Sequence, residues 1–214
     1  MLRIQQLTVG PLAENAWLLS DPESQRAVLV DPGDEPDRLL AAVDASGCTL
    51  EAIWLTHGHF DHIGGIAGVR RVHPVPVLMH PADQFFLDNA TLSAGQWGIQ
   101  LEAPDVVPEP LTDGGVVSLG AYTFTVWHVP GHSPGQVAFI GHGLCVSGDL
   151  LFADSIGRTD LPLCDPAAMQ QSLERVATLD EVTRVLPGHG VHTTIGRELA
   201  SNPFLRGPAR PRGA

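Results

Sequence analysis

Short apolar runs separated by glycine, proline and aspartate recur along this sequence of 214 residues. Runs of this length between turn-forming residues are typical of β-strands. We predict strands at Ala27–Val30, Ile53–Leu55, Val75–Met79, Tyr122–Val129, Val137–Ile140, Leu144–Val146 and Arg184–Leu186. We predict helices at Pro36–Ala45, Asp83–Leu87 and Ala167–Leu179. The last of these helices has clear start signals, because Asp165 can serve as its N-cap and Pro166 fits its first position.

No change in composition divides the sequence, so we predict a single domain over residues 1–205. Residues 206–214 are rich in proline, glycine and arginine, and we expect a disordered tail there. Residues 89–115 have weak periodicity and many glycine, proline and acidic residues. Two interpretations of this segment stay open, a lid over a site and a surface excursion.

The charge pattern excludes several functions. The chain has 12 Lys+Arg against 24 Asp+Glu, a formal charge of −12, and all its basic residues are arginine. It therefore has no Schiff-base or P-loop lysine, and its acidic surface argues against a nucleic-acid partner. Cys48, Cys145 and Cys164 show no CxxC spacing, so we expect neither a disulfide framework nor a cysteine-type zinc ribbon. Without a signal peptide or membrane-spanning stretch, we predict a cytoplasmic protein with no membrane partner.

The most informative segment is Thr56–Gly65, which holds His57, His59, Asp61 and His62. A buried histidine ordinarily needs one hydrogen-bond partner, so four titratable side chains within so short a loop point to chemistry. In a compact turn the first two can point to one position and the last two to a second. This arrangement suits two metal ions held a few ångströms apart.

Three further residues could complete such a site. His132, Asp149 and His189 each stand next to a glycine, which lets the backbone turn sharply. Each also follows a predicted strand closely, and loops at strand ends are where α/β proteins build their sites. We therefore predict that these loops converge on the histidine cluster.

The order His-x-His-x-Asp-His, then Gly-His, Gly-Asp and Gly-His resembles that of the metallo-β-lactamase superfamily, from about Asn15 to Phe204. This resemblance implies an α/β fold, a four-layer αββα sandwich whose two halves meet at the metal site. It also implies seven metal ligands. They are His57, His59 and His132 for the first metal, Asp61, His62 and His189 for the second, and Asp149 as a bridge between the two.

Within the superfamily, Ser147–Phe152 and Gly157–Pro162 look like the glyoxalase II-like hydrolases and their relatives, the persulfide dioxygenases. The segments Pro187–Gly190, Thr193–Glu198 and Asn202–Leu205 resemble the short bacterial glyoxalase II-like group. The resemblance implies a hydroxyacylglutathione hydrolase-like enzyme that cleaves thioesters of a small thiol, of the S-lactoylglutathione type. The longer enzymes of this kind contact glutathione through lysine and arginine, and this chain has no lysine, so the acyl group and the carrier thiol stay open.

Thioester hydrolysis requires a strong nucleophile at neutral pH. A metal ion can lower the pKa of its bound water to about 7, so a metal-bound hydroxide is the expected nucleophile. In this mechanism Asp149 bridges the metals, and Asp61 is a ligand that also orients the hydroxide. Histidine and carboxylate ligands suit zinc, iron or manganese. We predict two divalent metal ions, with zinc as the metal and iron or manganese as alternatives.

Two other functions compete with this prediction, a mononuclear-iron persulfide dioxygenase and a metal-binding module without catalysis. Retention of all seven ligands favours the dinuclear hydrolase. Arg158 is the candidate for binding a substrate carboxylate, because guanidinium binds carboxylate through two parallel hydrogen bonds. An ion pair with Asp154 or Asp160 is its alternative role. The oligomeric state is left open.

Overall fold

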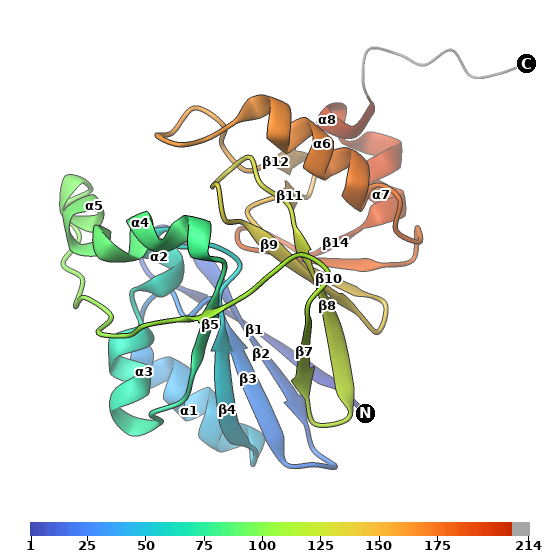
Figure 1. Ribbon diagram of the computed structural model, residues 1–214. Helices are drawn as coiled ribbons and strands as arrows, with labels where there is room; N and C mark the ends of the chain where they lie inside the picture. The colour runs from blue at the N-terminus through green and yellow to red at the C-terminus, as the bar shows by residue number, and fades with distance from the viewer. Residues whose placement is uncertain (207–214) are drawn as a thin grey trace, which may run out of the picture.

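Two six-stranded β-sheets lie face to face at the centre of this computed structural model, which describes residues 1–206 (Figure 1). In spatial order, the first sheet contains β1 (Arg3–Val9), β2 (Glu14–Asp21), β3 (Arg26–Val30), β4 (Thr49–Trp54), β5 (Val77–Met79) and β6 (Glu109–Pro110). The second contains β14 (Thr193–Thr194), β13 (Arg184–Pro187), β10 (Leu144–Gly148), β9 (Val137–Gly141), β8 (Tyr122–His128) and β7 (Val116–Leu119). A short hairpin of β11 (Leu151–Phe152) and β12 (Ser155–Ile156) follows β10.

Helices cover the outer face of each sheet, as Figure 1 shows. The first sheet is covered by α1 (Pro36–Ser46) and α3 (Ile66–Val72), and the second by α6 (Pro166–Val176) and α7 (Ile195–Ser201). The other helices are α2 (Phe60–Ile63), α4 (Gln84–Asp88), α5 (Ala90–Gln96) and α8 (Pro203–Arg206). The expected αββα sandwich is therefore confirmed. No helix within residues 1–206 has the length and apolar character needed to cross a membrane.

Side-chain alternation along the strands produces the layers. In β2, Trp17 and Leu19 pack between the two sheets, whereas Leu18 packs under the helices of the first sheet. All eight residues of β2 are buried, so the strand has no face exposed to solvent. A strand covered on both faces lacks the alternation of polar and apolar positions that marks a half-buried strand. This explains why the sequence pattern did not predict β2.

The seven predicted strands and three predicted helices are present, with ends that differ by a few residues. The N-cap prediction for α6 is confirmed, because the Asp165 carboxylate accepts hydrogen bonds from the backbone N–H groups of Ala167 and Ala168. The predicted end of this helix at Leu179 was wrong. The helix ends at Val176. Two turns follow it, in which the backbone N–H groups of Thr178 and Leu179 donate to the carbonyls of Arg175 and Val176.

The segment 89–115, which the sequence left undecided, divides into two parts. Its first part forms α5, which contacts α2 and α4, and its second part supplies β6 at the edge of the first sheet. Of the predicted tail, Arg206 is the last residue of α8, and residues 207–214 lie outside the described part of the chain.

Candidate metal centre

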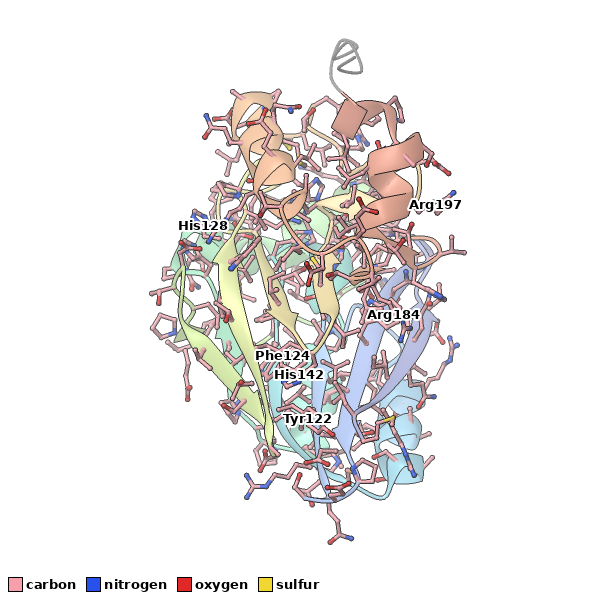
Figure 2. The ribbon with its side chains drawn as sticks, turned by 90° about the vertical axis from the view of Figure 1, so that its right-hand side faces the viewer. Tyr122, Phe124, His128, His142, Arg184 and Arg197 are labelled. Atoms are coloured by element: carbon pink, nitrogen blue, oxygen red, sulfur yellow. The ribbon has the colours of Figure 1, made fainter. Side chains whose placement is uncertain are left out.

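The strand directions bring the predicted site together at one end of the sandwich. β10 and β13 are parallel neighbours, and β8 runs the same way because β9 is antiparallel to both β8 and β10. The loops that leave these three strands carry His132, Asp149 and His189. Figure 2 labels His128 at the end of β8 from which the first of these loops departs. The loop after β4 brings the Thr56–Gly65 cluster to the same place from the first sheet.

The structure gathers the predicted ligands into two groups. Within each group, one potential ligand atom per residue lies within 4.8 Å of the others. One group is His57, His59 and His132, and the other is Asp61, His62 and His189. These are the two triads that the sequence resemblance implies. A further group with the same property, not predicted from the sequence, combines Asp31 with His57 and His62.

The carboxylate of Asp149 lies between the two groups. Its Oδ1 is 3.5 Å from Nε2 of His62, and its Oδ2 is 3.5 Å from Nε2 of His132. Oδ2 is also 3.6 Å from Nε2 of His189. One carboxylate thus faces both triads, which is the geometry expected of a bridge.

Hydrogen bonds on the far side of each ring fix the orientation of the histidines. The hydroxyl of Thr56 donates to Asp31, at 2.6 Å, so the Nδ1–H of His57 must donate to that hydroxyl and leave Nε2 as a lone pair. In the same way, Nδ1 of His132 is 2.8 Å from the carbonyl oxygen of Arg158. Nδ1 of His62 is 3.2 Å from Asp31. All three rings therefore present Nε2 to the centre, as metal-binding histidines do.

The residues present fit a metal site. Among the described residues, Nε2 of His57, Nε2 of His62 and Oδ1 of Asp149 are buried without a hydrogen-bond partner. Such atoms are costly unless something binds them. In addition, Nδ1 of His59 and Nε2 of His132 face each other at 2.8 Å. Imidazole nitrogens and carboxylate oxygens converging in this way are the donor set that divalent transition metals accept.

The pKa shifts of His57, His59 and Asp61 agree with this assignment. Burial holds the pKa of His57 well below its usual value, and burial beside His132 lowers the pKa of His59 to about 3. Both rings are therefore neutral at pH 7, the state that binds metal. Burial alone would raise the pKa of Asp61, but His62 and His189 outweigh it, so the pKa lies below its usual range.

The centre also concentrates negative charge. Burial disfavours the charged form of His62, yet Asp149, Asp61, Asp31 and Glu14 together raise its pKa well above the usual value. Burial raises the pKa of Glu14 itself well above its usual value, so the three aspartates are the groups that make this site favour cations, since buried charge needs a counter-charge.

Two of these carboxylates were not predicted from the sequence. Asp31 accepts hydrogen bonds from the backbone N–H and the hydroxyl of Thr56, and so anchors the start of the histidine loop. Glu14, 1% exposed, lies with Oε1 3.6 Å from Nδ1 of His62. The position of Asp31 in the sequence could have indicated its role, because Asp31 directly follows a buried strand, as Asp149 does. Glu14 gave no such signal, since it precedes the strand's apolar residues.

A third unpredicted residue, Asp83, joins two of the ligand loops. Its carboxylate, fully buried, accepts hydrogen bonds from the backbone N–H of Gly58 at 2.9 Å and of Gly135 at 2.6 Å. It also accepts one from the hydroxyl of Ser133 at 2.7 Å. Gly58 separates His57 from His59, and Ser133 follows His132. Asp83 therefore fixes the relative position of the loops that carry the whole first triad.

Gly188 is required for the loops to approach this closely. A Cβ at this position would lie 2.2 Å from Oδ1 of Asp149 and 2.7 Å from Cε1 of His62. No side chain fits there without moving Asp149 or His62. The glycine before His189 thus serves close packing at the centre.

A cavity of about 490 Å³ opens from the centre toward the surface. Five of the predicted ligands line its inner end: His59, Asp61, His132, Asp149 and His189. Its walls are formed by α4 and α5 on one side and by the segment 152–162 on the other. The first part of the undecided segment 89–115 therefore borders the site.

Arg158 lines this cavity, but its side chain has a partner. Its Nε and Nη2 donate to the two carboxylate oxygens of Asp160 at 2.8 and 2.9 Å. The alternative role considered for Arg158 is thus observed with Asp160, whereas Asp154 pairs with Arg197. The backbone carbonyl of Arg158 contributes to the centre by accepting from His132.

The fold and the centre define a class, an αββα sandwich with a histidine–carboxylate metal site at its strand ends. The chain belongs to the metallo-β-lactamase superfamily, because the sequence model of that family matches residues 9–189. Members of this superfamily bind divalent metals, and the histidine and aspartate groups described above suit such a site.

Individual relatives match over nearly the whole chain. The probable metallo-hydrolase YqgX of Bacillus subtilis is 36% identical, over 96% of this chain and 99% of its own length. The hydroxyacylglutathione hydrolase GloC of Haemophilus influenzae is 32% identical, over 95% of this chain and 98% of its own. The crystal structure of TTHA1623 in a di-iron-bound form is 46% identical, covers 94% of this chain and all of that one, and superposes with a TM-score of 0.88.

Proposed function

We propose that this protein is a dinuclear-metal hydrolase that cleaves thioesters of a small thiol, as glyoxalase II-like enzymes do. The observation that carries the proposal is the position of Asp149, whose two carboxylate oxygens face the two ligand triads at 3.5 Å each. The similarity to a hydroxyacylglutathione hydrolase over 95% of the chain supports the choice of thioesters.

The proposed ligands are His57, His59 and His132 for one ion, Asp61, His62 and His189 for the other, and Asp149 for both. Two divalent cations bound there supply an activated water and a Lewis acid for the thioester carbonyl. We propose zinc as the metal, because affinity for nitrogen and oxygen ligands ranks zinc above iron and manganese. The di-iron form of TTHA1623 makes iron the alternative to be tested first.

The chain's own side chains have distinct tasks in this reaction. Asp61, with Oδ2 3.3 Å from Nε2 of His189, is placed to hold and orient the attacking water. Asp31 and Asp83 keep the ligand loops in register through their hydrogen bonds to Thr56, Gly58 and Ser133. The leaving thiolate, with a thiol pKa of about 8.5, needs no dedicated proton donor.

The second candidate is a mononuclear-iron persulfide dioxygenase, which would use the same ligands. A direct comparison separates the two. We expect the zinc-loaded, full-length protein to hydrolyse acyl thioesters without consuming oxygen. Stoichiometric oxygen uptake with a persulfide by the iron-loaded protein, together with no thioester cleavage with either metal, would contradict the hydrolase proposal and favour the dioxygenase.

A further inference from the structure

We propose that the substrate group seated in the 490 Å³ cavity is uncharged and apolar, an aliphatic or aromatic acyl or thiol group, rather than a charged peptide such as glutathione. This inference rests on the proposed thioesterase function and narrows its substrate class. The acyl part and the thiol part of a thioester share this chemistry, and the experiment below distinguishes them.

Aromatic rings border the metal centre from both walls of the cavity. The Phe86 ring lies 4.5 Å from the His59 ring, centroid to centroid, on the α4 side. The Phe152 ring lies 6.0 Å from the His189 ring on the opposite side. A substrate group that extends from the reacting carbonyl therefore meets hydrocarbon on either side as soon as it leaves the ligands.

The mouth of the cavity combines apolar side chains with the uncharged polar side chains of Asn89, Ser93 and Gln96. Phe85, Leu92 and Trp97 line it and are 55%, 66% and 54% exposed. Phe85 lies on the short helix α4 and Leu92 on the short helix α5. Trp97 directly follows α5 and packs near Phe60, with ring centroids 6.3 Å apart. Exposed apolar side chains that converge on one cavity mark a binding surface, whereas single ones scattered over a surface do not.

Charges that could hold a glutathione carboxylate are occupied. Among the described residues, Arg158 is the arginine that lines this cavity, and two nitrogens of its guanidinium donate hydrogen bonds to the Asp160 carboxylate. The neighbouring cavity of about 190 Å³ contains Arg71, which pairs with Glu102 at 2.6 Å. Exchanging one exposed carboxylate partner for another gains little free energy. The chain has no lysine and a formal charge of −12, so few positive charges are available to bind an anionic substrate.

Burial of hydrocarbon gives a measurable signature. Each CH₂ moved from water into an apolar site corresponds to about a fourfold gain in affinity or kcat/KM. On one neutral thiol, N-acetylcysteamine, we expect kcat/KM of the metal-loaded protein to rise at least about 20-fold from acetyl to hexanoyl. The second arm keeps the acetyl group and compares butanethiol with glutathione as the carrier. A rise in the acyl arm alone assigns the cavity to the acyl group, and a preference for butanethiol alone assigns it to the thiol.

Substitutions at the mouth test whether this cavity is responsible. We expect Trp97→Ala to lower the hexanoyl-to-acetyl ratio of kcat/KM by about fivefold or more, because the ring supplies part of the wall. Val182→Ala is the matched control, since Val182 is 82% exposed, apolar and not part of the cavity. The ratio should not change in this control. A flat acyl series together with better turnover of the glutathione thioester than of both neutral thioesters would overturn the inference.

A binding measurement separates this inference from the proposed function. S-hexyl- and S-methyl-N-acetylcysteamine are thioethers, which lack the acyl–sulfur bond that a thioesterase cleaves. We expect calorimetry to give at least about tenfold tighter binding of the hexyl compound, and Trp97→Ala to reduce that difference. If the protein cleaves no thioester but still prefers the hexyl thioether, the proposed function fails and the apolar site stands. If it cleaves thioesters but binds both thioethers equally, the apolar site fails and the function stands.

Discussion

The two ends of the cavity differ in how they are built. At the inner end, His57 and His62 are fully buried. The Nδ1 atoms of His57, His62 and His132 bond to the Thr56 hydroxyl, the Asp31 carboxylate and the Arg158 carbonyl, which fixes the three rings. At the outer end, the apolar side chains are half exposed or more. Phe85 and Leu92 stand on helices of five and seven residues, and Trp97 directly follows the second helix. Hydrogen bonds of the inner end join segments far apart in the sequence, such as His62 to Asp31. The side-chain hydrogen bonds at the outer end are local, from Gln84 to Asp88 and from Asn89 to the Phe85 carbonyl.

This difference indicates that the residues proposed to bind metal and the residues proposed to select the substrate can be changed independently. A change at the inner end should alter metal binding and turnover of every substrate. A change at the outer end should alter the ranking of substrates with the metal content unchanged. The following predictions test that separation.

Loss of the bridging carboxylate should have the largest effect. We expect Asp149→Ala to lower thioester turnover by on the order of 1,000-fold or more, because one side chain serves both triads. The fold should persist, as measured by circular dichroism and thermal unfolding. Asp44→Ala, at an exposed position of α1, is the matched control and should keep normal activity. Near-normal turnover of Asp149→Ala in metal-replete buffer would show that Asp149 is not the bridge.

The close packing at Gly188 should be nearly as sensitive. A methyl group there would collide with Asp149 and His62, so we expect Gly188→Ala to weaken metal affinity by about 10–100-fold. Competition with a chromophoric chelator measures this directly. Gly95→Ala is the control, because a Cβ at that helical position meets nothing within 4 Å. Equal metal affinity in the two variants would mean that the loops can shift without cost.

A substitution of Asp83 tests whether a residue outside the two triads supports the proposed metal centre. We expect Asp83→Asn to destabilise the fold by about 2–3 kcal/mol, since an amide cannot accept from all three donors and leaves some buried and unpaired. Metal affinity should fall as well, because Gly58 and Ser133 lose their common anchor. Urea unfolding and chelator competition measure the two effects, with the exposed Asp88→Asn on α4 as control. Unchanged metal affinity in Asp83→Asn would limit Asp83 to a purely stabilising role.

Much of the inner end could be predicted from the sequence because its chemistry is local. His57, His59, Asp61 and His62 occupy one loop, and their crowding signals metal binding before any fold is known. The roles of Asp83, Asp31 and Glu14 could not be predicted in this way. Each acts across a long interval of sequence, and Asp83 reaches Ser133, 50 residues away, only because the two halves pack together.

The outer end could not be predicted because its elements carry weak patterns. In α5, Leu92 is exposed and Ala94 is buried, the reverse of what hydrophobicity alone indicates. Leu92 faces the cavity rather than the core, so helical periodicity gives no clear signal. The ion pair of Arg158 with Asp160 was one of two roles that the sequence left open, and only the folded loop selects between them.

Arg158 should give the smallest effect. Its guanidinium already has a carboxylate partner and is 55% exposed, so we expect Arg158→Gln to raise KM for a glutathione thioester by no more than about twofold. Its backbone carbonyl, which supports His132, is retained in this variant. Steady-state kinetics with glutathione and N-acetylcysteamine thioesters measure the comparison. A tenfold rise in KM confined to the glutathione substrate would restore Arg158 as the carboxylate-binding residue.

The number of metal ions per chain tests the central claim most directly. Elemental analysis of the full-length protein by mass spectrometry, after loading with excess metal and removal of the unbound ions, gives this number. Two triads and a bridge predict about two ions per chain, falling to one or none in Asp149→Ala. A single ion per chain in the loaded protein, still bound when Asp61 and His189 are both replaced by alanine, would contradict the dinuclear centre.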